Sequence, residues 1–284
     1  MFIYSLAALL FLGCDADTGT DPVTPLTPEL AKQMLDVSYG EDPQQTMDIY
    51  LPAGRITDQT KVFLLVHGGG WKEGDKSELN FLVVYLKTYF PNHAIANINY
   101  RLGTVENIGY PRQVQDLQTA IQYLNDRTEE FSLSKQYAMI GVSAGAHLSM
   151  LYAYRHDKDR RIKALCSMVG PSDFSDPNYD GNDLFTTGLR YFVGDYPTYD
   201  SNPALFNEIS PSRYISVRSP KTILIYGTED PIVPESQGQI LHQKLNQKLV
   251  YNEYHEFDVA HIGWTVDQLA EMQAKMTAFF TSHF

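Results

Sequence analysis

Short apolar runs bounded by turn residues recur along most of this chain, and segments with helical spacing lie between them. The runs predict strands at Met47 to Leu51, Val62 to Val66, Ala94 to Tyr100, Tyr137 to Val142, Ile162 to Val169, Thr222 to Tyr226 and Val250 to Phe257. Helices are predicted at Leu79 to Phe90, Val114 to Asn125, Ala146 to Tyr154, Gln237 to Leu249 and Val266 to Phe284. Strands that alternate with helices indicate β-α-β units and a mostly parallel sheet with helices on both faces. The predicted fold class is therefore α/β.

Residues 173–207 break this alternation. The segment is rich in Asp, Tyr, Phe and Gly and shows no clear period beyond a possible helix near Leu184 to Phe192. Because its aromatic residues need something to pack on, a lid or a pocket wall is the favoured interpretation. An ordinary surface excursion is the alternative.

Composition and charge exclude several classes of protein. The chain has 284 residues, 43% of them hydrophobic, enough for a sizeable core in one domain, predicted at residues 37–284. The net charge of −12 argues against nucleic acid as a partner, since binding phosphates requires clustered cations. Two cysteines, Cys14 and Cys166, are too few for a disulfide scaffold and lack the spacing of a zinc site.

The N-terminus has the pattern of an export signal. Phe2 to Leu12 is apolar but too short to span a bilayer, and Leu12-Gly13-Cys14 has the layout of a bacterial lipoprotein signal. No Lys or Arg precedes the run, so an ordinary secretory signal, a hydrophobic tail or a start further upstream stays open. We expect residues 1–14 to be a signal and residues 15–36 an acidic Pro/Thr-rich linker. The protein would then be exported and anchored to a membrane through lipidated Cys14, in the periplasm or at the cell surface, or otherwise secreted.

The pentapeptide Gly141-Val142-Ser143-Ala144-Gly145 directly follows an apolar run and predicts a catalytic nucleophile. A serine hydroxyl attacks efficiently only when a sharp strand-to-helix turn presents it to a base. Small residues two positions away on either side keep that turn free of clashes. Ser143 is therefore the candidate nucleophile.

A second motif, His67-Gly68-Gly69-Gly70-Trp71, follows the strand predicted at Val62 to Val66. Acyl transfer needs backbone N–H donors aimed at the developing oxyanion, and glycine allows the close approach that this requires. The N–H of Ala144 would add a donor at a helix start. A flexible turn or a phosphate loop is the alternative, but the Lys-Ser/Thr or G-x-G-x-x-G of a phosphate loop is missing.

The order of residues along the chain selects the base and the acid. In serine hydrolases built on such sheets, the acid and then the histidine follow the serine on loops after late strands. His261 lies in such a loop, whereas His255 lies inside the last predicted strand, so His261 is the better base. Asp230 follows the strand Thr222 to Tyr226 and is preferred over the neighbouring Glu229, with Asp258 as its rival. Two other histidines are given supporting roles: His147 as a packing residue and His67 as a brace for the glycine loop.

Together these motifs resemble the α/β-hydrolase superfamily, in particular the HGGGW-type esterase/lipase group of feruloyl- and acetyl-xylan-esterase-like carboxylesterases. The resemblance extends from about Val37 to the C-terminus. It implies a catalytic triad of Ser143, Asp230 and His261, an oxyanion hole formed by Gly69, Gly70, Trp71 and Ala144, and no metal or organic cofactor. Arg101 and Asp116 match family positions that support the scaffold.

The resemblance implies hydrolysis of carboxylic esters, with short acyl or carbohydrate-linked aryl or acetyl esters as substrates. The partner would be a small-molecule or polysaccharide-linked ester. A serine peptidase of the prolyl-oligopeptidase type shares the late Asp and His, although such enzymes usually carry a large propeller domain that this chain lacks. A non-catalytic binding module on the same fold is the other alternative.

Overall fold

A single eight-stranded sheet organises the computed structural model, which describes residues 28–196 and 198–284. In chain order the strands are β1 (Lys32–Ser38), β2 (Thr46–Leu51), β3 (Val62–Val66), β4 (Ala94–Ile98), β5 (Tyr137–Val142), β6 (Ile162–Met168), β7 (Lys221–Gly227) and β8 (Asn252–Phe257). Their spatial order is β1-β2-β4-β3-β5-β6-β7-β8, with β2 antiparallel to both neighbours and all other pairs parallel. The predicted α/β class with a mostly parallel sheet is confirmed.

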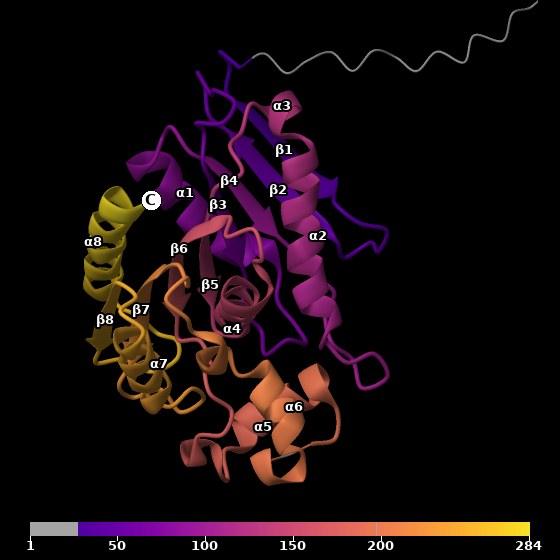
Figure 1. The fold of residues 1–284 in the computed structure, drawn as a ribbon, viewed down its shortest axis with the longest axis vertical. Coiled ribbons are helices and arrows are strands. Elements are labelled where there is room, and N and C mark those ends of the chain that lie inside the picture. The colour runs from indigo at the N-terminus through magenta and orange to yellow at the C-terminus, as the bar shows by residue number, and fades with distance from the viewer. Residues whose placement is uncertain (1–27, 197) are drawn as a thin grey trace, which may run out of the picture.

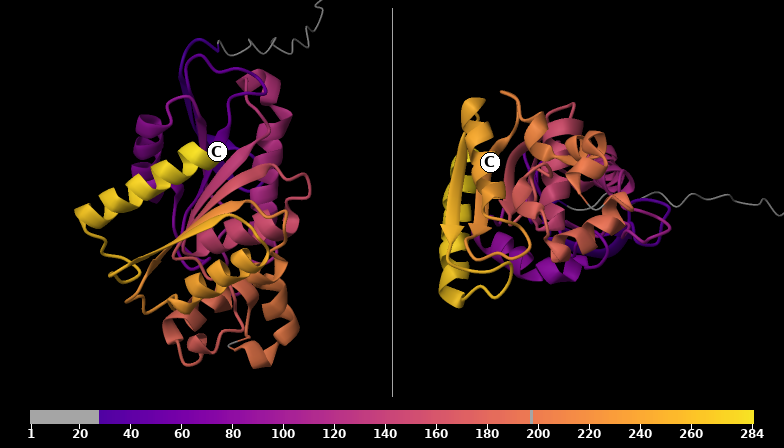
Figure 2. Two further views of the ribbon diagram at one scale, coloured as in Figure 1. Left: turned by 60° about the vertical axis from the view of Figure 1, so that its left-hand side comes forward. Right: turned by 90° about the horizontal axis from the view of Figure 1, so that it is seen from below.

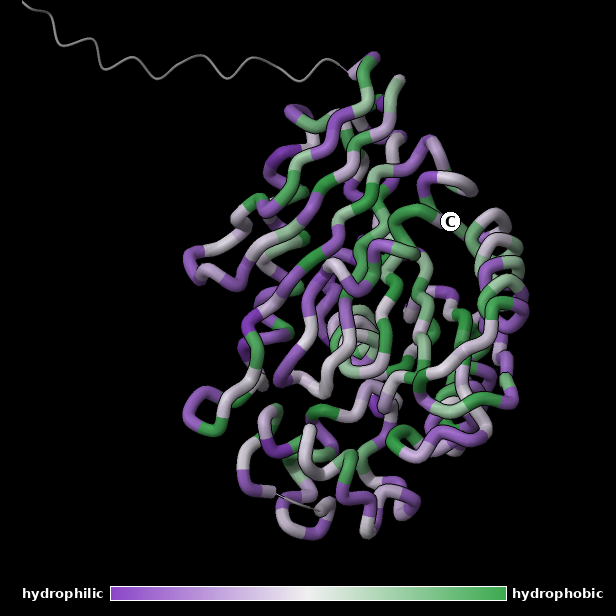
Figure 3. Tube along the Cα trace, turned by 180° about the vertical axis from the view of Figure 1, so that it is seen from behind, coloured by the Kyte–Doolittle hydropathy of each residue, from purple (hydrophilic) through white to green (hydrophobic). Residues whose placement is uncertain are grey.

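Helices cover both faces of this sheet, as Figures 1 and 2 show. On one face lie α2 (Arg112–Asp126), α4 (Ala144–Leu151) and α7 (Ser236–Gln247), and on the other α1 (Asn80–Tyr89) and α8 (Val266–His283). The central strands alternate between the two cores: Leu64 of β3 packs in the first, Phe63 and Leu65 in the second. These side chains are fully buried, and burying each contributes roughly 1.5–3 kcal/mol. Figure 3 shows hydrophobic residues concentrated along these inner strands.

The N-terminal boundary of the domain differs from the prediction. β1 begins at Lys32, so residues 32–36, predicted as the end of the linker, belong to the sheet instead. Most β1 side chains are exposed, which is why this edge strand has no apolar pattern to reveal it. Arg55 also holds the chain before β1, donating a 2.6 Å hydrogen bond to the carbonyl of Leu30. The predicted signal, Cys14 and the linker up to residue 27 lie outside the described residues.

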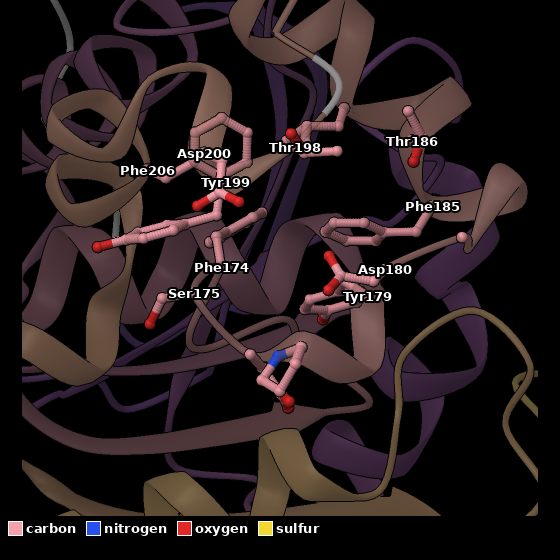
Figure 4. A pocket seen from close by; sticks show the side chains of 14 residues that line it. Phe174, Ser175, Tyr179, Asp180, Phe185, Thr186, Thr198, Tyr199, Asp200 and Phe206 are labelled. Atoms are coloured by element: carbon pink, nitrogen blue, oxygen red, sulfur yellow. The ribbon is translucent and has the colours of Figure 1, made fainter.

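The segment between β6 and β7 is a folded insertion, not an irregular excursion. Its elements are η3 (Pro177–Tyr179), α5 (Asp183–Val193), η4 (Tyr199–Ser201), α6 (Pro203–Ile209) and η5 (Pro211–Tyr214), grouped at the lower end of the molecule in Figure 1. α5 is the helix predicted near Leu184 to Phe192. A pocket of about 210 Å³ lies in this region. Figure 4 shows aromatic side chains among the residues that line it. Phe174, Phe185 and Phe206 are buried there and pack in the same hydrophobic core as Leu64 of β3, so the insertion is continuous with the core on that face of the sheet.

The remaining elements are short. A 3-10 turn, η1 (Lys76–Leu79), leads into α1, and α3 (Thr128–Phe131) follows α2. The helix predicted at Ala146 to Tyr154 begins earlier, as α4, and continues into the π-helical turn η2 (Tyr152–His156). Among residues 28–196 and 198–284, no helix combines the length and the apolar character needed to cross a membrane.

A buried carboxylate joins the N-terminal strands to α2. Asp116 of α2 is fully buried and accepts hydrogen bonds from the Arg101 side chain at 2.5 and 2.9 Å, from the Arg101 backbone N–H at 2.8 Å and from Gln45 at 2.7 Å. These contacts agree with the scaffold role expected for Arg101 and Asp116. Removing Asp116 would leave the charge of Arg101, whose side chain is only 22% exposed, and the Arg101 and Gln45 donors without their acceptor.

We therefore expect Asp116→Ala to lower the free energy of unfolding by about 3 kcal/mol or more. Urea denaturation followed by circular dichroism measures the change. Glu130→Ala is the matched control, because Glu130 forms a half-exposed pair with Arg127 at 3.8 Å, worth no more than about 1 kcal/mol. Equal losses for the two variants would contradict this reading of the Asp116 network.

Stability should also depend on pH through His93. Its ring lies 5.3 Å from Phe63 and 5.4 Å from Phe284, and burial lowers the pKa of His93 to about 4. The unfolded chain, with an ordinary histidine pKa near 6.5, therefore binds a proton before the folded chain does. The resulting stability is present above pH 6.5 and is lost as the pH falls toward 4. His93→Phe should flatten the pH dependence of the unfolding free energy between pH 6.5 and 5; an unchanged slope would refute this assignment.

Candidate active site

Ser143 lies at the turn between β5 and α4 with φ 52° and ψ −120°, a left-handed backbone that non-glycine residues rarely adopt. The turn is possible because its neighbours are small. A Cβ on Gly141 would collide with the backbone of Ala146, and one on Gly145 would collide with the carbonyl of Val66. The pentapeptide thus folds as the sharp strand-to-helix turn that its residues predict, and the Ser143 side chain faces a cleft.

The structure brings Ser143, His261 and Asp230 together. His261 Nε2 lies 2.9 Å from Ser143 Oγ, and His261 Nδ1 lies 2.6 Å from Asp230 Oδ2. The three residues follow β5, β8 and β7, whose carboxyl ends meet at one edge of the sheet. With Nδ1–H donating to the carboxylate, Nε2 is left to accept the proton of Ser143.

Asp230 is held in place by the loop around it. Its carboxylate is fully buried, and Oδ1 accepts the backbone N–H groups of Ile232 at 2.8 Å and Val233 at 2.9 Å. Oδ2 is left for His261. The rival residues lie elsewhere: Asp258 is exposed, and His255 Nε2 is 3.2 Å from a carboxylate oxygen of Glu253.

The glycine loop after β3 lies against the serine turn. A Cβ on Gly68 would sit 3.3 Å from the Cβ of Ser143, and both Gly69 (φ 102°) and Gly70 (φ 53°) have positive φ. Among the described residues, no acceptor is bonded to the N–H groups of Gly69, Gly70 or Ala144. Ala144 is the first residue of α4, where the helix dipole favours negative charge. These N–H groups are therefore available to an oxyanion.

Trp71, predicted to be part of the oxyanion hole, has its side chain behind the glycine loop and not in the cleft. The indole is 2% exposed, stacks on Phe192 at 5.0 Å and donates a 3.1 Å hydrogen bond from Nε1 to His147 Nδ1. Its carbonyl accepts the N–H of Gly103. Trp71 therefore anchors the loop that carries the glycines. His147 was predicted to be a packing residue, and it also accepts this hydrogen bond from Trp71. Its position on an apolar helix could not reveal the bond.

His67 braces the same loop, as predicted. It is fully buried, its ring stacks on Tyr100 at 4.3 Å, and its Nδ1–H donates to the carbonyl of Gly68 at 2.8 Å. Tyr100 in turn donates to the carbonyl of His67 at 2.9 Å. Burial lowers the pKa of His67, so the ring stays neutral.

A cleft of about 610 Å³ opens over Ser143. Large apolar side chains form most of its wall: Leu79, Phe81, Met168, Val169, Leu184, Ile232, Ile262, Trp264 and Leu269. Three of them remain exposed at its mouth, Leu184 by 62%, Ile262 by 79% and Phe81 by 43%. The sequence does not reveal these residues as a cleft wall, because isolated apolar positions on a helix or loop look the same whether they face a cleft or the core. The insertion contributes to the wall through Leu184, Thr187 and Gly188 of α5.

Besides His261, the cleft is lined by three charged residues, Lys72, Glu73 and Glu78, all from the segment between β3 and α1. Lys72 Nζ lies 3.4 Å from Glu73 Oε1. Within the described part of the chain, no group of three or more His, Cys, Asp or Glu side chains is arranged to hold a metal ion.

Comparisons with known proteins agree with this architecture. The esterase LipC of Mycobacterium tuberculosis is 25% identical over 221 residues, 74% of this chain and 54% of that protein. This chain spans little more than half the length of the first curated relatives it matches.

Solved structures show the same fold. A truncated carbohydrate esterase from gut microbiota superposes with a TM-score of 0.74 at 19% identity, over 91% of this chain and 98% of that one. An inhibited esterase B from Lactobacillus rhamnosis superposes with a TM-score of 0.67 at 20% identity, over 90% and 88% of the two chains. The family model described as BD-FAE matches residues 47–245, which is more than half of the chain. The chain therefore belongs to the BD-FAE family and has the α/β-hydrolase fold.

Proposed function

We propose that this protein is a serine hydrolase that cleaves carboxylic esters through an acyl-enzyme on Ser143. The observation that carries the proposal is the continuous hydrogen-bonded chain from Ser143 Oγ through His261 to Asp230, with distances of 2.9 and 2.6 Å. Such a chain activates a hydroxyl that is otherwise a poor nucleophile at neutral pH. One curated relative, named esterase LipC, supports the same activity.

In the proposed reaction, His261 Nε2 takes the proton of Ser143 as Oγ attacks the ester carbonyl. The carbonyl oxygen becomes an oxyanion that accepts the N–H groups of Gly69, Gly70 and Ala144. Asp230 stabilises the imidazolium through Nδ1–H, and His261 then protonates the leaving alcohol as the carbon–oxygen bond breaks. Water repeats the sequence on the acyl-enzyme and releases the acid.

The size and the apolar lining of the cleft support a substrate ester whose acyl group is apolar and larger than acetyl. The cleft volume of about 610 Å³ far exceeds an acetyl group, and apolar side chains such as Phe81 and Trp264 cover most of the cleft wall. The charged lining from Lys72, Glu73 and Glu78 suits hydroxyls on the alcohol part, such as those of a sugar. We therefore propose aryl or medium-chain acyl esters, including carbohydrate-linked ones, as the preferred substrates.

Replacing the nucleophile tests the chemistry. Ser143→Ala should lower kcat for p-nitrophenyl butyrate by about 10³-fold or more, because the variant lacks the hydroxyl oxygen that attacks the ester carbonyl. Ser149→Ala is the matched control: this serine is buried on α4, the helix that follows Ser143, and its hydroxyl has no partner among the described residues. Its loss should leave kcat nearly unchanged. Mass spectrometry after treatment with a fluorophosphonate should place the adduct on Ser143. An active Ser143→Ala variant would remove this residue from the mechanism, and cleavage of an aminoacyl-proline p-nitroanilide without ester hydrolysis would favour a peptidase.

Truncating the apolar wall tests the substrate. Phe81→Ala should lower kcat/KM for p-nitrophenyl octanoate and methyl ferulate by roughly five- to tenfold and for p-nitrophenyl acetate far less, because only the larger acyl groups reach this ring. Val84 lies on the same helix as Phe81 but is 65% exposed and does not line the cleft, so Val84→Ala should leave kcat/KM unchanged for all three substrates. An equal loss for acetate and octanoate would contradict an acyl site beside Phe81.

A further inference from the structure

His147 has both ring nitrogens engaged although it is completely buried. Trp71 Nε1 lies 3.1 Å from Nδ1, and the carbonyl oxygen of Ile209 lies 2.9 Å from Nε2. An indole N–H can only donate and a carbonyl can only accept. Nδ1 is therefore the acceptor, Nε2 carries the proton, and the ring is neutral in one defined tautomer.

The same residue connects three parts of the active site that lie far apart in the sequence. Its backbone N–H donates to the carbonyl of Ser143 at 3.0 Å, one helical turn away. Through Trp71 its ring reaches the glycine loop. Through Ile209 it reaches the insertion, because Ile209 is the last residue of α6, whose terminal carbonyls lack partners within the helix.

Aromatic packing leaves the His147 ring little freedom to turn. Trp71 lies 5.4 Å away, Phe174 5.0 Å and Phe192 5.2 Å, each nearly perpendicular to the imidazole. Desolvation by these neighbours lowers the pKa of His147 to about 4. A charged ring would turn Nδ1 into a donor that faces the indole N–H, so the link to Trp71 requires the neutral form.

A displacement of Trp71 would also displace the oxyanion donors of the glycine loop. Trp71 directly follows Gly70 and itself has a left-handed backbone, φ 62°, which costs free energy and persists only while its surroundings hold it. From the other side α5 packs against the loop, since a Cβ on Gly188 would lie 3.5 Å from the carbonyl of Gly70. The loop at Gly70 is thus held between α5 and the contacts of the Trp71 side chain.

We propose that His147 is a positioning residue for ester hydrolysis, whose neutral imidazole ties the oxyanion loop, through Trp71, to the insertion, through Ile209. This role rests on the proposed function. It differs from general packing because it requires an acceptor toward Trp71 and a donor toward Ile209. An apolar side chain of similar size supplies neither, whereas the amide of glutamine supplies both.

Kinetics of matched variants test the role. His147→Leu should lower kcat for p-nitrophenyl butyrate by about 10- to 100-fold with KM within about twofold, because misplaced oxyanion donors weaken only the transition state. Affinity for a phenylboronic acid, which forms a tetrahedral adduct on serine, should fall in parallel. His147→Gln should recover most of kcat. Trp71→Phe, which keeps an aromatic ring but loses the indole N–H, should resemble His147→Leu. Equal losses for Leu and Gln, or a change in KM alone, would overturn the proposal.

A measurement independent of activity tests the link itself. The chain contains two tryptophans, Trp71 and Trp264, so tryptophan-labelled protein gives two indole N–H signals in an NMR spectrum, assigned with Trp264→Phe. In His147→Leu the Trp71 signal should move upfield and exchange faster with D₂O, while in His147→Gln it should stay close to wild type. An unmoved signal would refute the hydrogen bond. If the signal moves but the wild-type protein hydrolyses no ester, the proposed function fails; if esters are hydrolysed equally well without His147, only this inference fails.

Discussion

The left-handed backbone of Ser143 is the constraint on which the rest of the site depends. Holding a non-glycine residue at φ 52° costs of order 1–3 kcal/mol, which packing elsewhere must offset. β5 lies in the middle of the sheet between β3 and β6, and α4 is buried along its whole length, so strand and helix ends cannot relax apart. The N–H of Ser143 is tied to the carbonyl of Met168 at 2.8 Å. The packing of the core thus holds the partly buried Ser143 hydroxyl at the cleft.

The parallel strand order brings the other residues of the candidate site to the turn at Ser143. β3, β5, β7 and β8 all end at the same edge, so the glycine loop, Ser143, Asp230 and His261 converge there from four separate loops. His261 and Ser143 are 118 residues apart in the chain yet 2.9 Å apart in space. Rigid strands on either side of each loop explain how such distances are maintained without a metal or disulfide within the described residues.

The insertion contributes in two ways, on opposite sides of the glycine loop. Toward the cleft, α5 presents Leu184, which stays 62% exposed, and such exposed apolar surface beside a nucleophile favours an apolar substrate group. Toward the interior, the aromatic cluster of Phe174, Phe185 and Phe192 encloses Trp71 and His147. The proposed acyl site and the proposed positioning of the oxyanion donors therefore share one structural element.

The amino-acid sequence was enough to predict the α/β class, most strands and helices, and the serine, acid and histidine that the structure brings together. Those signals are local: the period of apolar residues, glycines at a sharp turn, and the order of motifs along the chain each depend on near neighbours. Three features became visible in the folded chain alone: residues 32–36 join the sheet as an edge strand, the Trp71 side chain faces the interior, and both ring nitrogens of His147 form hydrogen bonds. The tertiary structure also decided which apolar side chains form the cleft. These outcomes depend on contacts between residues far apart in the chain, which leave no periodic trace in the sequence.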